Sequence, residues 1–355
     1  MAGDTPTSIL TRWYIDTRPL TSTTSTLPLL HTLQHTDQIS VQKYYHLKDK
    51  HMSLASNLLK YLFVHRTCRV PWSSIVISRT PDPHRRPFYI HPSKDSDYRE
   101  GGIEPINVEF NVSHQASMVA IAGTTIPSPP PSLSPSPAAP STASINSTPL
   151  VGIDITCINE RAGRTNEIRT LDSLHNYIDI FAEVFSAREI RDMKSLHGAP
   201  SPSSSSLSND DLVDYGYRLF YTYWALKEAY IKMTGEALLA PWLRELEFSN
   251  VVAPSPSRQS EEGEGMFGVP YTGVKTTMNG DAVQDVRIEV VALEGDYLFA
   301  TAARGANLGF GSGLRSEGNS DSAVGGGGDP WMPFQKLDIE RDIRPCATGV
   351  CSCLS

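Results

Sequence analysis

The chain has 355 residues, of which 39% are hydrophobic and 8% aromatic, enough for a sizeable core in two ordinary domains or one larger domain with insertions. Its formal net charge of −8 argues against a dedicated nucleic-acid-binding protein, and it has no run of about 18 apolar residues that would span a membrane. The five cysteines form no disulfide framework, and the first residues lack the pattern of a signal peptide. We therefore expect a cytoplasmic protein.

Patterned segments alternate with segments rich in Pro, Ser or Gly. In chain order, hydrophobic periodicity predicts a helical region over 36–66, strands over 74–78, 106–112, 118–122 and 150–155, helices over 171–194 and 211–234, and a hairpin of 286–293 with 297–303. Gly235 follows the last helix, where a left-handed residue is favoured. We interpret 126–149, 198–209, 252–283 and 304–329 as surface insertions.

This order predicts two α+β halves joined near residue 150. We expect an N-terminal half over 1–125, a Pro/Ser-rich insertion over 126–149, a C-terminal half over 150–303, and a Gly-rich linker with a C-terminal tail over 304–355.

A polar cluster ends the predicted strand that precedes the first insertion. The sequence FNVSHQ at 110–115 presents a hydroxyl, an imidazole and an amide, a set suited to binding oxyanions or a metal. Taken alone, the cluster is explained more simply as a polar turn.

A carboxylate interrupts the apolar run VGIDIT at 151–156. Because a buried carboxylate is unfavourable without a partner, Asp154 needs a bound cation, or it caps or salt-bridges a neighbouring element. Gly152 would let another backbone or a ligand approach closely.

A third cluster, WALKEAYIK at 224–232, lies on the helix of 211–234. Glu228 and Lys232 are four residues apart and project from one face of that helix. The simple alternative is a surface ion pair worth a few tenths of a kcal/mol. Since most of the helix circumference is apolar, however, Glu228 is expected to be buried and to need a cation.

Basic side chains precede the first insertion: Lys43, Lys48, Lys50, Lys60, Arg79, Arg85 and Arg86. Beside a pair of metal-binding carboxylates they would suit a polyanionic substrate such as a pyrophosphate, although each alone is an ordinary surface charge. Neither a P-loop nor a hydrolase nucleophile elbow is present.

Three cysteines lie close together near the C-terminus: Cys346, Cys351 and Cys353. They could bind a metal or accept a lipid. Because no histidine is nearby in the sequence, we interpret them as part of an inert tail.

The motifs FNVSHQ, GIDI and W-x-L-K-E-A-Y-I-K, in this order and after basic residues, resemble the surfactin-type 4′-phosphopantetheinyl transferases over about residues 10–303. YYHLKDKHMSLASNLLKYLFVHR and the ending CATGVCSCLS look closest to the broad-range fungal enzyme of this family, which serves secondary metabolism and lysine synthesis. The resemblance implies a monomer of two similar α+β halves related by pseudo-twofold symmetry.

The resemblance also implies a reaction. 4′-Phosphopantetheine would pass from coenzyme A to a serine of acyl or peptidyl carrier domains, and adenosine 3′,5′-bisphosphate would be released. The carriers would belong to fatty acid, polyketide and nonribosomal peptide synthases and to aminoadipate reductase.

Site residues follow from the same resemblance. Asp154 and Glu228 would ligate Mg²⁺ on the coenzyme A pyrophosphate, Glu228 would accept the serine proton directly or through a metal-held water, and Lys232 would stabilise the leaving bisphosphate. The remaining coenzyme A contacts would come from Ser113 and His114 on the 3′-phosphate and from Lys48, Arg79 and Arg86 on the other phosphates or the adenine edge. Arg86 is preferred to Arg85 because it directly precedes Pro87, as the family's basic residue does.

The chain departs from many bacterial members at Thr156, where they carry a second acidic residue. Gln115, through its amide oxygen, or a water would then be the third metal ligand.

Two further hypotheses belong to other functional classes. The first is a non-catalytic protein that binds coenzyme A or carrier domains with the same fold. The second is an interaction scaffold whose P-x-x-P spacings within 126–149 dock SH3-like or WW-like domains.

Overall fold

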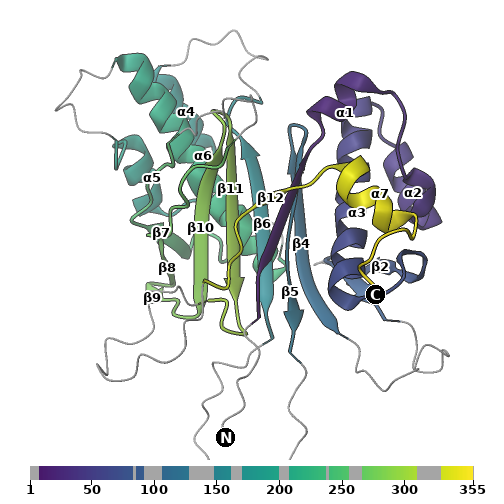
Figure 1. The fold of residues 1–355 in the computed structure, drawn as a ribbon. Coiled ribbons are helices and arrows are strands. Elements are labelled where there is room, and N and C mark those ends of the chain that lie inside the picture. Colours follow the sequence, from purple (N-terminus) through teal and green to yellow (C-terminus); the bar gives the residue numbers. More distant parts are fainter. Residues whose placement is uncertain are drawn as a thin grey trace, which may run out of the picture. The chain divides into compact units, whose positions relative to one another are not determined.

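The computed structural model describes residues 8–82, 85–91, 106–127, 148–160, 170–199, 208–236, 240–255, 266–309 and 329–354. The chain forms two compact units, one of 1–151 with 303–355 and one of 152–302. Both units contain helices and sheets, which confirms the α+β class (Figure 1). The pseudo-twofold relation stays a prediction. Most of 126–149, with its hypothetical docking motif, and much of 198–209 and 304–329 lie outside the described residues.

The first unit is built on a four-stranded sheet in the order β12-β1-β5-β4. Its strands are β1 (Thr11–Asp16), β4 (Asn107–Gln115), β5 (Met118–Ile126) and β12 (Gln335–Lys336). β5 is antiparallel to both β1 and β4, whereas β12 is parallel to β1. The C-terminal residues, expected as a linker and tail, thus supply an edge strand to the sheet that β1 begins.

The long helix α3 (Leu47–Cys68) packs on β4 and β5 and is buried along most of its length. It is preceded by α1 (Arg18–Thr23) and α2 (His35–Gln42), and followed by the hairpin of β2 (Val76–Arg79) and β3 (Pro87–Ile90). The helical region predicted over 36–66 is therefore two helices. Residues 43–46 contain neither Gly nor Pro, so the pattern carries no signal for the break.

The second unit has a three-stranded sheet in the order β10-β11-β6, formed by β6 (Leu150–Cys157), β10 (Val286–Leu293) and β11 (Tyr297–Arg304). The predicted hairpin of 286–293 and 297–303 is confirmed. Helix α6 (Asn209–Thr234) packs against β10 and ends at Gly235, whose φ of 81° is left-handed as predicted.

Two predictions for the second unit were wrong in detail. Residues 171–194 form α4 (Leu171–Ile180) and α5 (Ala187–Lys194), because Ser186 and Glu189 make a capping box that starts a new helix. Residues 252–283 are not simply an insertion. They include β8 (Lys275–Met278) and β9 (Asp281–Ala282), which pair with β7 (Leu246–Ser249) in a small antiparallel sheet.

Gly152 fixes how closely β6 approaches α6. A Cβ atom at this position would collide with the backbone of Ala229 and of Met233 on the helix, and a rotamer change cannot move backbone atoms away. The sequence predicted that another backbone or a ligand approaches Gly152 closely, and the structure shows that it is the backbone of α6. Since side chains two residues apart on a strand share a face, Asp154 is directed to the same helix.

Gly152→Ala is expected to destabilise the second unit by about 3 kcal/mol, because β6 and α6 must separate to admit the methyl group. Urea denaturation followed by circular dichroism measures the loss. Gly295→Ala is the matched control, since its Cβ would meet no atom within 4 Å. Equal stability of the two variants would contradict the close approach of strand and helix.

Candidate active site

Asp154 lies buried on β6 and accepts from two side chains. Lys232 Nζ lies 2.6 Å from Asp154 Oδ1, and Thr156 Oγ1 donates to Asp154 Oδ2 over 2.8 Å. Of the two alternatives for Asp154, a bound cation or a salt bridge to a neighbouring element, the structure shows the salt bridge, to Lys232 of α6. Thr156, which replaces the acidic residue of many bacterial members, orients Asp154 instead of adding a charge. We call Asp154, Thr156, Glu228 and Lys232 the β6–α6 cluster.

Glu228 lies one helical turn before Lys232 on α6 and is only partly exposed. The pKa of its carboxyl is raised from 4.5 to about 7, mainly by burial and also by the negative charge of Asp154, while Lys232 opposes the shift. In the described part of the chain, no side chain donates a hydrogen bond to this carboxylate. This partly buried position near the ammonium group of Lys232 agrees with the expectation that Glu228 is largely buried and needs a cation.

The raised pKa predicts a pH-dependent stability in metal-free protein. Between 4.5 and about 7 the folded chain holds a proton on Glu228 that the unfolded chain has lost, so the free energy of unfolding falls as pH rises through this window. Glu228→Gln removes that fall. With EDTA present, we compare the free energy of unfolding of the variant with that of the wild type. Their difference should shift in favour of the variant by on the order of 2–3 kcal/mol between pH 4.5 and pH 8. Urea unfolding at several pH values measures this difference. If the free energies of unfolding of the two proteins changed with pH in parallel, the raised pKa would be contradicted.

Lys227 has a role that the sequence analysis did not assign. It is fully buried, and its Nζ lies 2.9 Å from Glu189 Oε2 on α5. It also donates to the carbonyl oxygens of Leu243, at 3.1 Å, and Leu246. Lys227 thus anchors the segment of α6 that carries Glu228. A lysine on a helix with a mostly apolar circumference was the signal available in the sequence.

In the first unit, the FNVSHQ motif lies inside β4 rather than in a turn after it. Ser113 and Gln115 pair with Ala120 and Met118 of β5, and residues two apart share a face of the sheet. Ser113 is buried, whereas His114 is exposed and points to the opposite face. The three polar groups are therefore divided between two faces instead of forming one set.

The β4–β5 turn follows directly, with both turn residues in left-handed backbone. Ala116 has a φ of 47° and Ser117 a φ of 72°, as a two-residue type I′ hairpin requires. The carbonyl of Ser117 accepts from the backbone and the hydroxyl of Thr17, over 2.8 and 2.9 Å. These bonds hold the turn that ends the motif in place.

The basic residues of the first unit that are predicted to contact phosphates differ in how many protein groups they already bind. Arg86 forms a short ion pair with Glu109 and donates to the carbonyl of Val151 over 3.2 Å. Lys48, in the first turn of α3, is exposed. Arg79 is also exposed, and it donates to the carbonyl of Arg85 over 3.1 Å. An anion would therefore share Arg86 with Glu109, while Arg79 and Lys48 face solvent.

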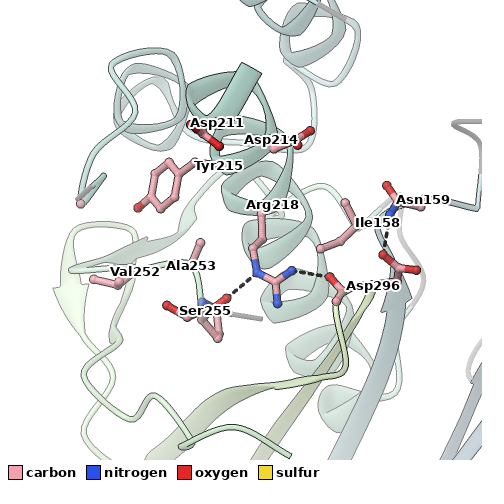
Figure 2. Close-up of a pocket in the computed structure, with 13 residues that line it drawn as sticks. Ile158, Asn159, Asp211, Asp214, Tyr215, Arg218, Val252, Ala253, Ser255 and Asp296 are labelled. Carbon is pink, nitrogen blue, oxygen red and sulfur yellow. Dashed lines mark hydrogen bonds between the residues drawn. The ribbon is translucent and has the colours of Figure 1, made fainter. Parts of the chain in front are cut away.

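A pocket of about 540 Å³ lies in the second unit, at the N-terminal part of α6 (Figure 2). Arg218 points into it and donates to the carbonyl oxygens of Pro254 and, over 2.7 Å, of Gly295. The pocket is also lined by Asp211, Asp214, Tyr215 and Asp296. No member of the β6–α6 cluster lines it, so this pocket is separate from the predicted site.

Comparison with known proteins identifies the family. A family model described as 4′-phosphopantetheinyl transferase, N-terminal, matches residues 19–126, and one of the 4′-phosphopantetheinyl transferase superfamily matches residues 150–287. The chain is 68% identical over 348 residues, 98% of its own length and 96% of the relative's, to 4′-phosphopantetheinyl transferase NpgA of Emericella nidulans. The chain belongs to the 4′-phosphopantetheinyl transferase superfamily.

Two further fungal relatives carry the same family name. 4′-Phosphopantetheinyl transferase A of Aspergillus fumigatus is 58% identical over 352 residues, which is 97% of this chain and 96% of the relative. A 4′-phosphopantetheinyl transferase of Aureobasidium melanogenum is 35% identical over 94% of this chain and 96% of its own. The resemblance of the three motifs to this family, and to its fungal branch, is confirmed. In the described part of the chain, no helix is long and apolar enough to cross a membrane.

Proposed function

We propose that this chain transfers 4′-phosphopantetheine from coenzyme A to a serine hydroxyl of acyl and peptidyl carrier domains. The observation that carries the proposal is the β6–α6 cluster, in which two carboxylates lie near each other and near the ammonium group of Lys232. Family membership at 68% identity to a named transferase supports the reaction class.

The donor set of this cluster fits Mg²⁺. Asp154 and Glu228 offer hard carboxylate oxygens, and they are near enough for the charge of Asp154 to raise the pKa of Glu228. These two residues would hold the ion, with Gln115 of β4 or a water as the third ligand. When bound, Mg²⁺ neutralises charge on the pyrophosphate of coenzyme A.

Glu228 is proposed to accept the proton of the carrier serine, directly or through a metal-held water, because it is the carboxylate next to both Asp154 and Lys232 in the β6–α6 cluster. The serine oxygen forms a bond to the phosphorus that bears pantetheine, and the bond from that phosphorus to the bridging oxygen breaks. Adenosine 3′,5′-bisphosphate leaves with the bond's electrons, and Lys232 would stabilise its negative charge.

Five residues of the first unit are proposed to bind the other phosphates or the adenine edge: Lys48, Arg79, Arg86, Ser113 and His114. Since Ser113 and His114 face opposite sides of β4, the exposed His114 is the stronger candidate for a direct contact through its side chain. Arg86 is the weaker basic candidate, because Glu109 already neutralises it.

An assay of adenosine 3′,5′-bisphosphate release tests the proposal against the non-catalytic alternative. Release that requires both an apo carrier domain and Mg²⁺ is expected with fatty acid, polyketide, nonribosomal peptide and aminoadipate-reductase carriers. Binding of coenzyme A without release on any of these carriers would support a binding protein instead. Release from coenzyme A without a carrier would also contradict the proposal.

A further inference from the structure

A histidine and three cysteines that are far apart in the sequence meet in the first unit. The ligand atoms of His65, Cys346, Cys351 and Cys353 all lie within 4.8 Å of one another. His65 belongs to the last turns of α3, and Cys346 to α7 (Arg344–Ala347), which packs beside α3 (Figure 1). The premise of the inert-tail interpretation, that no histidine is nearby, does not hold in the structure, because His65 comes from a helix some 280 residues earlier.

From this cluster we propose a structural zinc site of the Cys₃His type that fastens the C-terminal segment to α3. Structural zinc centres have four protein ligands of this kind, which leave no coordination position for a substrate. The site is distinct from the β6–α6 cluster in its ligands, its metal and its unit of the chain.

One pair of sulfurs already has the separation of a tetrahedral site. Zn–S bonds of about 2.3 Å at tetrahedral angles place two sulfurs about 3.8 Å apart. The Sγ atoms of Cys346 and Cys353 are 3.7 Å apart, and His65 Nε2 is 3.2 Å from Cys351 Sγ. A sulfur separation of 3.7 Å is far longer than the roughly 2.05 Å of a disulfide bond.

His65 is already held as a metal ligand. Its Nδ1 lies 2.7 Å from the carbonyl oxygen of Val70, which can only accept, so Nδ1 carries the proton and Nε2 keeps its lone pair toward the cysteines. A backbone carbonyl on the second ring nitrogen is the usual support of a histidine that binds zinc.

The cysteine loop is shaped by its backbone. Gly349, at a φ of 75°, turns the chain after α7, and the amides of Val350 and Cys351 both donate to the carbonyl of Pro345, over 2.9 and 3.1 Å. Four residues separate Cys346 from Cys351, within the usual spacing of a zinc loop, and one separates Cys351 from Cys353.

Charge and access also suit the ion. Three thiolates with Zn²⁺ leave a net charge of −1, and the positive charge of Arg66, next to His65 on α3, lies near Cys346. A pocket of about 600 Å³ lined by His65, Cys346 and Cys351 provides a path for entry.

Metal analysis of the full-length protein, purified without chelators, tests the site. We expect about one zinc per chain by inductively coupled plasma mass spectrometry, and near-complete loss in Cys351→Ser. Cys68→Ser is the matched control and should keep its zinc, because Cys68 lies on the same helix three residues after His65 but outside the cluster. The chelator TPEN, which prefers zinc to magnesium, should lower the Tm of the wild type and of Cys68→Ser, but not that of Cys351→Ser.

Cobalt substitution keeps the proposal testable if Cys351→Ser fails to fold. Wild-type protein loaded with Co²⁺ should show the visible bands of tetrahedral cobalt and thiolate-to-cobalt charge transfer. Absence of zinc together with a featureless cobalt spectrum would overturn the proposal. So would a disulfide among Cys346, Cys351 and Cys353 in protein isolated under reducing conditions.

Discussion

Asp154→Asn and Glu228→Gln should each lower kcat for transfer by about 10³-fold or more, because both substitutions remove a charge from the proposed metal site. Glu228→Gln also removes the proposed base. Both variants keep the shape of the side chain. The asparagine oxygen at 154 can still accept from Lys232, and the asparagine NH₂ group can donate to the hydroxyl oxygen of Thr156. Circular dichroism should therefore change little, and the urea midpoint of Glu228→Gln should not fall below that of the wild type.

The matched control for these variants is Glu183→Gln. Glu183 carries a carboxylate of the same unit, but its side chain is 89% exposed and pairs loosely with Arg244 at 3.5 Å. Its turnover should equal that of the wild type. Turnover of Glu228→Gln within tenfold of the wild type would contradict the assignment of Glu228.

Lys227→Met should destabilise the protein by about 3–5 kcal/mol, because it leaves the carboxylate of Glu189 buried without its cation. Burial raises the pKa of Glu189 and the charge of Lys227 lowers it, so without Lys227 the carboxyl is expected to take up a proton. Urea denaturation at neutral pH measures the loss.

Adding Glu189→Gln to Lys227→Met should recover most of that stability. The glutamine oxygen can still accept from the backbone amide of Phe248, which Glu189 holds at 2.8 Å, but it buries no charge. Lys194→Met is the control, since Lys194 pairs with the half-exposed Asp179. This substitution should lower the free energy of unfolding by less than about 1 kcal/mol. If both lysine variants lost the same stability, the buried pair would not be an anchor for α6.

Local pattern was sufficient for much of the fold. The hairpin of β10 and β11 and the end of α6 at Gly235 follow from strand alternation and from the backbone freedom of glycine, which are properties of neighbouring residues. The capping box at Ser186 was also readable, and overlooking it merged α4 with α5. The break between α2 and α3 has no such signal.

What the sequence could not provide are contacts between distant segments. The parallel pairing of Trp13 with Gln335 and the cluster of His65 with Cys351 each join residues that periodicity cannot relate. The same limit explains Lys227, whose partner Glu189 lies on another helix. Motif resemblance identified the family and pointed to Asp154, Glu228 and Lys232, but the hydrogen bond from Thr156 to Asp154 required coordinates.

The most direct test of the central claim is intact-protein mass spectrometry of one apo carrier domain after reaction with coenzyme A and Mg²⁺. With the wild type, the carrier should gain the mass of one phosphopantetheine group, and fragmentation should place it on the carrier serine. The gain should disappear with Glu228→Gln and with EDTA, and it should persist with Glu183→Gln. An unmodified carrier with the wild type, or equal modification by Glu228→Gln, would contradict transfer by the β6–α6 cluster.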